Sequence, residues 1–119
     1  MPYDEKLADR VRENLSLREH LHIEEKEMFS GLCFMVNARM CVNVSGNNLM
    51  CRIHPSKAEE LSELEGYIPM IMKGKQLKGY CYVTPDGFKS TKDFNFWIDL
   101  CLQYNSTAKA SKKKKKEAH

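Results

Sequence analysis

Residues 32–53 read LCFMVNARMCVNVSGNNLMCRI, and this stretch decides the fold. It contains three apolar runs, at 32–36, 40–44 and 49–53. The separators are Asn37-Ala38-Arg39 and Ser45-Gly46-Asn47-Asn48, whose asparagines and glycine tolerate a positive φ and are typical of hairpin turns. The stretch therefore predicts three strands of an antiparallel meander.

Alternation within the runs predicts which side chains share a face of the sheet. The first run is apolar on both faces, which is typical of a strand that is buried on both sides. In the second run, Met40, Val42 and Val44 are expected to lie on one face. In the third run Leu49, Cys51 and Ile53 are expected to lie opposite Met50 and Arg52. If helices cover only one face, the other would carry Cys33, Met35, Cys41 and Met50.

The segments before the meander predict a helix and one more strand. Asp4 can cap a helix over 4–18, because its carboxylate can accept a hydrogen bond from a free backbone N–H. The apolar stripe of this helix consists of Leu7, Ala8, Val11 and Leu15. From Leu21 to Met28 or Phe29, apolar and polar residues alternate, which predicts a short strand. Ser30-Gly31 is expected to form a turn or a bulge.

The segment after the meander predicts a short helix and two strands. Ser56 and Glu59 have the spacing of a capping box, and Gly66 is expected to end the helix. Its inward-facing residues would be Ala58, Leu61 and Leu64. An extended segment at 69–72 and a strand at 77–83 follow, and in the latter Lys78, Tyr80 and Tyr82 are expected to share a face.

The final predicted element is the best amphipathic helix of the chain. A strong turn at Thr84-Pro85-Asp86-Gly87 precedes it, and Ser90-Thr91-Lys92-Asp93 opens it. Its apolar face consists of Phe94, Trp97, Ile98, Cys101 and Leu102. The element order predicts an α+β two-layer sandwich, in which an antiparallel sheet of five to six strands is covered by the N- and C-terminal helices.

Charge divides the chain into a domain and a tail. Residues 107–119 hold six lysines and one glutamate, so the net charge of this segment is +5. Residues 1–106 hold 13 basic and 15 acidic side chains, so their net charge is −2. The tail also lacks apolar residues that could be buried. We therefore expect a domain over 1–105 and a disordered lysine-rich tail over 106–119.

Several functional classes are disfavoured by the composition. No apolar run is long enough to span a bilayer, and the acidic N-terminus is unlike a secretory signal, so we expect a cytoplasmic protein without a membrane partner. The odd number of cysteines, five, favours buried reduced thiols over a disulfide framework.

No catalytic or cofactor motif is present, so the sequence predicts neither an enzyme nor a cofactor. Cys51 and His54 have a spacing that places them on opposite faces of a strand, which does not suit a shared proton. His20, His22 and Glu24 share a strand face and could chelate a metal. However, no second Cys or His pair has the spacing of a structural zinc site.

Two interaction surfaces remain as candidates. The first, a possible partner surface or homodimer interface, is the uncovered face of the sheet together with a hairpin that carries Lys73, Lys75, Lys78, Tyr80 and Tyr82. The second is the tail, whose contact with nucleic acid would be weak, sequence-independent and sensitive to salt. Its cationic residues are Lys109, Lys112, Lys113, Lys114, Lys115 and Lys116.

The chain resembles the N-terminal domain of the TfoX/Sxy family over about residues 3–105. The central motif, residues 26–37, reads KEMFSGLCFMVN and is similar to that family's K-x-M-F-G-G-x-x-F-M-x-N. Residues 3–12 look like its opening helix, Met70 and residues 77–83 resemble its closing strand segment, and a polylysine end is common in short members. Ser30 replaces the first glycine of the usual pair.

The resemblance implies an α+β sandwich with no established catalytic or ligand-binding residues. Full-length members are regulators of natural competence, thought to act with the cyclic-AMP receptor protein. They also carry a second, helical domain that this sequence does not contain. The expected function is thus that of a non-enzymatic regulatory domain acting through protein contacts, and the alternative is a small accessory nucleic-acid-binding protein that uses its lysine tail.

Overall fold

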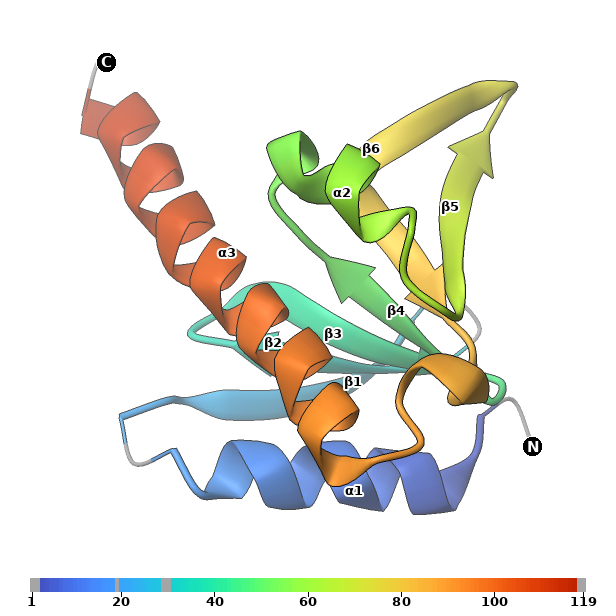
Figure 1. The fold of residues 1–119 in the computed structure, drawn as a ribbon. Helices are drawn as coiled ribbons and strands as arrows, with labels where there is room; N and C mark the ends of the chain where they lie inside the picture. Colours follow the sequence, from blue (N-terminus) through green and yellow to red (C-terminus); the bar gives the residue numbers. More distant parts are fainter. Residues whose placement is uncertain (1–2, 19, 29–30, 118–119) are drawn as a thin grey trace.

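The computed structural model describes residues 3–18, 20–28 and 31–117, with side chains described as far as Ser106. The helices are α1 (Glu5–Ser16), α2 (Ala58–Leu61) and α3 (Thr91–Glu117). The strands are β1 (Ile23–Met28), β2 (Gly31–Val36), β3 (Arg39–Ser45), β4 (Asn48–Arg52), β5 (Tyr67–Met72) and β6 (Lys75–Val83). They form one antiparallel sheet in the order β1-β2-β3-β4-β6-β5 (Figure 1). The predicted α+β class and the predicted terminal helices are confirmed.

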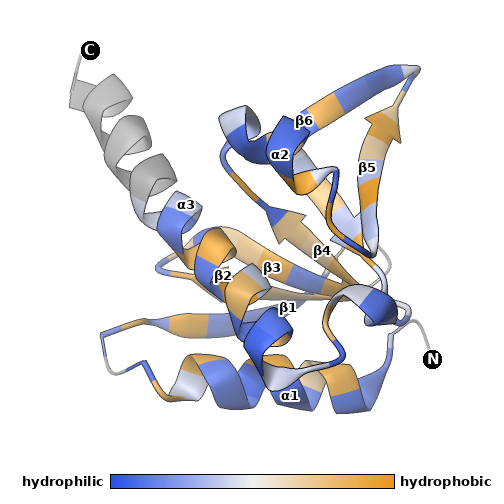
Figure 2. Ribbon diagram, in the orientation of Figure 1, coloured by the Kyte–Doolittle hydropathy of each residue, from blue (hydrophilic) through white to orange (hydrophobic). Residues whose placement is uncertain are grey.

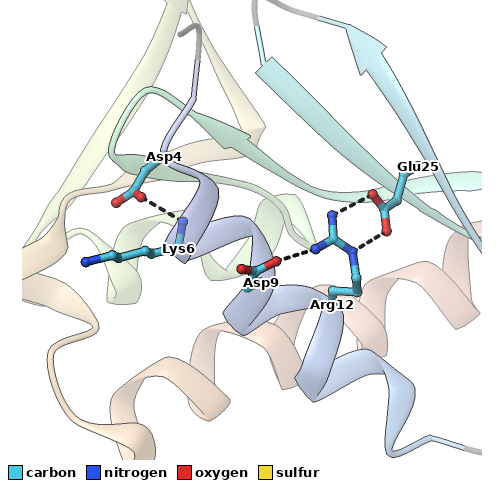
Figure 3. Close-up of polar contacts among 5 residues, drawn as sticks. All are labelled: Asp4, Lys6, Asp9, Arg12 and Glu25. Atoms are coloured by element: carbon cyan, nitrogen blue, oxygen red, sulfur yellow. Dashed lines mark hydrogen bonds and ion pairs between the residues drawn. The ribbon is translucent and has the colours of Figure 1, made fainter.

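Helix α1 forms as its sequence predicts. The Asp4 carboxylate accepts a hydrogen bond from the Lys6 backbone N–H at 2.9 Å (Figure 3). All four residues of the predicted apolar stripe are buried. On the polar side, the Arg12 guanidinium donates two hydrogen bonds to the Glu25 carboxylate in β1, at 2.6 and 2.8 Å. Arg12 thus ties the helix to the edge of the sheet.

The turns of the meander are tighter than the sequence analysis predicts. Asn37 and Ala38 both have positive φ, 52° and 69°, as a two-residue turn of type I′ requires. Arg39 already belongs to β3 and pairs with Val36. Gly46 supplies the positive φ, 58°, of the second turn. The predicted turn or bulge at Ser30-Gly31 lies partly outside the described residues, as does Phe29.

A bulge in β3 corrects the predicted faces of that strand. Val42 lies opposite Phe34, whereas Met40 lies opposite Met35, so Cys41 is an extra residue in β3. An extra residue reverses the alternation beyond it. Met40 therefore points away from the helices, and Cys41 joins Val42 and Val44 in the core beneath them. The predictions that Met40 shares a face with Val42, and that Cys41 lies on the uncovered face, are wrong.

The apolar residues form two separate cores, one on each face of the sheet. The helix-side core joins α1, α2 and α3 to the sheet and contains the large buried side chains Trp97, Phe34, Leu15 and Ile98. In Figure 2, β4 and β5 are largely hydrophobic along their length. The second core lies on the opposite face, and its described members all come from strands.

The short helix departs from its prediction in two respects. The ring of His54, not the side chain of Ser56, caps this segment, because His54 Nδ1 accepts the Ser56 backbone N–H at 3.1 Å. A 3-10 turn at Pro55–Lys57 precedes α2, so the predicted capping box does not form. Ala58 and Leu61 are buried as predicted, but Leu64 is 41% exposed because α2 ends at Leu61.

Helix α3 begins as predicted and continues further. The Ser90 hydroxyl accepts the Asp93 backbone N–H at 3.0 Å, and the Trp97 indole donates to the Gly87 carbonyl at 3.2 Å. The helical backbone runs to Glu117, through the segment for which the sequence predicts disorder. Lysine and alanine are good helix formers, so a helix fixed by packing upstream can extend into them. The domain boundary near residue 105 stays a prediction.

Gly31 provides a test of the packing between β2 and β3. A Cβ at this position would lie 2.1 Å from the Val44 carbonyl oxygen, a backbone atom. We expect Gly31→Ala to lower the free energy of unfolding by about 2 kcal/mol or more, as measured by denaturant unfolding. The control is Gly46→Ala, where a Cβ meets open space and only the positive φ costs about 1 kcal/mol. Equal losses in the two variants would contradict this account.

The Arg12–Glu25 pair should make stability depend on pH. The hydrogen bonds from Arg12 hold the pKa of Glu25 below its ordinary value near 4.5. Because the pKa of Glu25 is lower in the folded state, the pair stabilises the fold at pH values above the ordinary pKa of Glu25. This contribution disappears as the pH falls through the pKa of Glu25 in the folded state. Near neutral pH, we expect Arg12→Ala to cost about 0.5–1 kcal/mol, because both groups are partly exposed.

A double-mutant cycle with Glu25→Gln isolates this pair. The coupling energy should be present at pH 7 and vanish in acid, where Glu25 is protonated. A coupling that stays constant across that range would show that the two side chains contribute through packing alone.

Candidate functional site

The uncovered face of the sheet is the candidate functional site. We call it the methionine face and define it by Met28, Cys33, Met35, Met40, Met50, Met70, Leu77, Tyr80 and Tyr82. Cys33, Met40, Met50 and Met70 are buried by their long neighbours, and the others are partly exposed. In the part of the chain that the structure describes, no helical residue joins this cluster. The face is therefore an apolar surface built by strands alone.

Strand pairing extends this face toward the open edge at β5. Ile68 pairs with Tyr82 across the ladder, and cross-strand partners share a face. Met72 follows Met70 by two residues, so it also lies on this side. Both side chains are substantially exposed, Ile68 at 41% and Met72 at 54%. The face thus ends in exposed apolar groups beside the β5–β6 hairpin, at the upper right of Figure 1.

An irregularity in β6 divides the predicted partner surface. Pro69 pairs with Cys81 but Ile71 pairs with Gln76, so β6 has extra residues between these pairs. As a result Leu77 and Tyr80 both reach the methionine face despite their odd spacing. Met72 pairs with Lys75, which places the Lys75 side chain on the methionine face as well.

The five predicted partner residues are therefore not all on one surface. Tyr80, Tyr82 and Lys75 lie on the methionine face, and Lys73 occupies the hairpin turn with a positive φ of 52°. Lys78 instead lines a cavity of about 390 Å³ beside α2, together with Gln76. The prediction that Lys78 shares a face with the two tyrosines is wrong, because the extra residues in β6 reverse the alternation between them.

A cationic–aromatic cluster that the sequence analysis missed lies at one corner of the face. The Arg52 guanidinium lies over the rings of Tyr80, 6.0 Å from the centroid, and Tyr104, 5.4 Å from the centroid. His54 meets Tyr104 edge-on with a centroid distance of 6.0 Å. These contacts attach α3 to the end of β4. Only tertiary folding brings Arg52 and Tyr104 together, so no local pattern could have indicated the cluster.

A cavity of about 470 Å³ between α1 and α3 is lined by charged groups, and Arg10, Arg18 and Asp99 among them already have partners. Arg18 donates to the Asp99 carboxylate at 2.8 Å. The Arg10 guanidinium lies 4.1 Å from the centroid of the Phe94 ring and donates to the Phe88 carbonyl. These contacts hold the helices together, so we assign the cavity a structural role.

The side chains considered for catalysis or metal binding do not form a site. Cys51 is fully buried in the helix-side core, whereas His54 is exposed and accepts the Ser56 backbone N–H. His20 and His22 are exposed, and His22 Nε2 lies 4.0 Å from a Glu24 carboxylate oxygen. Among the described residues, no group of three or more potential metal ligands converges.

All five cysteines are buried and free. Burial raises the pKa of Cys33 to about 11, although the nearby Lys26 opposes this shift. Hydrogen bonds with Cys101 and Cys81, together with burial, raise the pKa of Cys51 well above its ordinary value. Burial does the same for Cys41. These three thiols therefore stay protonated at neutral pH, and a protonated thiol is a poor nucleophile.

Alkylation measures this protection directly. We expect the native protein to gain no adduct during brief treatment with iodoacetamide at pH 8, and to gain five adducts when it is unfolded, as counted by intact mass. The unfolded sample is the control for reagent competence. Rapid single labelling of the native protein, mapped to Cys33, would show that this thiol is accessible and more acidic than its burial implies.

The comparisons with known proteins agree with the fold and give the family. In the described part of the chain, no helix combines the length and apolar character needed to cross a bilayer. No curated protein matches the chain. No solved structure matches it either. The family model for the TfoX N-terminal domain matches residues 16–104, about three quarters of the sequence. This span includes the whole sheet and about half of α3, as far as Tyr104, and the chain belongs to the TfoX N-terminal domain family.

Proposed function

We propose that this chain is a non-enzymatic regulatory domain that acts by binding another protein through its methionine face. The observation that carries the proposal is the one-sided covering of the sheet: α1, α2 and α3 pack on one face, and the apolar cluster on the other face consists of methionine, cysteine, leucine and tyrosine side chains from strands. The buried amide of Asn43 lies in the same face, opposite Cys33 and Met50. Methionine adapts to irregular partner surfaces, and tyrosine is enriched at protein interfaces.

Family membership supports the regulatory part of this proposal. The TfoX N-terminal domain match, together with the resemblance to competence regulators, favours a cytoplasmic role in the control of transcription. The protonated thiols and the engaged histidine His54 favour binding over catalysis. The exposed apolar residues at the β5 edge provide the contact groups that such a role requires.

A second candidate function is weak nucleic-acid binding by the lysine-rich end. It is favoured by the +5 charge of residues 107–119. The side chains that would make the contacts lie outside the described part of the chain. Deletion of residues 107–119 therefore separates this function from binding through the methionine face.

Capture of partners from the native cell extract tests the proposal. We expect Ile68→Glu to abolish capture of a specific protein, because a charge would be placed among the apolar contact groups of the methionine face. Phe96→Glu is the matched control, since Phe96 is exposed to nearly the same degree, 43%, but lies on α3. Loss of capture with both variants, or with neither, would contradict the proposal. Loss only after deletion of residues 107–119 would favour the second candidate.

A further inference from the structure

We propose that the methionine face binds a second copy of this chain, with the two-fold axis running parallel to the strands. This inference rests on the proposed function, in which the same face is the binding surface. It adds the identity of the occupant and the orientation of the contact. The argument comes from the two edges of the sheet and from the charges that lie along them.

The edge at β5 is poorly suited to in-plane pairing with another sheet. The Thr84 backbone N–H donates to the Gly66 carbonyl at 2.9 Å, and hydrogen-bonded pairs alternate along an antiparallel ladder. Pro69, opposite Cys81, is therefore in a non-hydrogen-bonded pair, and its nitrogen faces the open edge. Because proline has no N–H, this edge lacks a donor at its centre.

The other edge, at β1, is protected by charge. Glu24, Glu25 and Glu27 are all exposed along this strand, with Lys26 between them. Pairing of two β1 strands would bring like charges together, which is destabilising. Since both edges resist sheet extension, contact through the face is the association that remains open to the sheet.

Charges of opposite sign lie at opposite edges of the methionine face. Glu24 pairs with Met35, so it lies on this face at the β1 edge. Lys75 pairs with Met72 and lies on the same face at the hairpin, beside Lys73. Both charges are near the same end of the sheet, the end at which the Asn37-Ala38 turn lies. Glu24 is close to this end in β1, and the β5–β6 hairpin extends beyond Arg52, the last residue of β4, in the same direction.

These positions select one orientation for the pair of sheets. A two-fold axis parallel to the strands exchanges the edges but keeps the ends together, so Glu24 of each copy approaches Lys75 of the other. An in-plane axis perpendicular to the strands would instead place β1 against β1, with its acidic side chains facing each other. The isologous contact closes after two copies and satisfies both charge pairs.

Two other cations on this face are compatible with the contact. Arg52 is held by the Tyr80 and Tyr104 rings at the corner. Lys26, opposite Cys33, can lay its alkyl chain on the apolar surface and keep its ammonium group at the rim. The six strands, which are five to nine residues long, cover roughly 600 Å² in plan, which is below the ~800 Å² per partner of a standard interface. We therefore expect a reversible, concentration-dependent dimer.

Sedimentation of the full chain, from low micromolar to near-millimolar concentration, tests this inference. The average mass should rise toward twice the monomer mass. Lys75→Glu should weaken dimerisation about tenfold, because it places two acidic groups together at both edges of the contact. Combining it with Glu24→Lys should restore dimerisation. Both positions are exposed, so the fold should tolerate these changes. Lys92→Glu, the same charge change on α3, is the matched control and should have no effect.

Three results would overturn the inference: a monomer at every concentration, a dimer that is insensitive to Lys75→Glu, or a weakened dimer that the double variant does not restore. The proposed function is judged separately by partner capture. If the chain is monomeric while Ile68→Glu still removes a captured protein, the second copy is wrong as the occupant and the methionine face remains a binding surface. If the predicted dimer forms and Ile68→Glu weakens it, a second copy is supported as the occupant of the methionine face, and partner capture still decides the proposed function.

Discussion

Three helices are available to cover one face of a six-stranded sheet, and the apolar side chains on the other face must be buried without them. Strands β2, β3 and β4 carry apolar residues on both faces, so neither face can be left to water at little cost. The solution is a second core in which long, flexible methionine side chains cover one another and two tyrosines. The rest of the molecule follows from this division into two cores.

Irregular strand pairing decides which residues belong to each core. The extra residue at Cys41 moves Met40 to the methionine face and keeps Cys41 beneath the helices. The extra residues in β6 bring Leu77 and Tyr80 to the same face and leave Lys78 beside α2. Each irregularity adds an apolar group to the uncovered face. The composition of the candidate site is therefore a result of bulges as much as of residue types.

The thiols and the groups suited to protein contact lie mostly on different faces of the sheet. Four of the five cysteines lie in the helix-side core. Burial keeps the Cys41 thiol protonated there, and hydrogen bonds with neighbouring thiols together with burial do the same for Cys51, so both contribute as packing groups. The groups suited to contact lie at the periphery of the other face: exposed Ile68 and Met72, partly exposed tyrosines, and Lys75. This arrangement supports a domain that binds rather than one that reacts.

The sequence by itself determined the element order, the antiparallel meander, both long helices with their buried stripes, and the family. Those features depend on local periodicity, on turn residues such as Asn37 and Gly46, and on caps such as Asp4 and Ser90, all of which act within a few residues. Only the tertiary structure decided the face of Met40, the exposure of Leu64, the cap at His54 and the contact of Arg52 with Tyr104. Bulges and long-range contacts depend on how neighbouring strands and helices fit together. A prediction from strict alternation assumes that a strand has no extra residue relative to its partner.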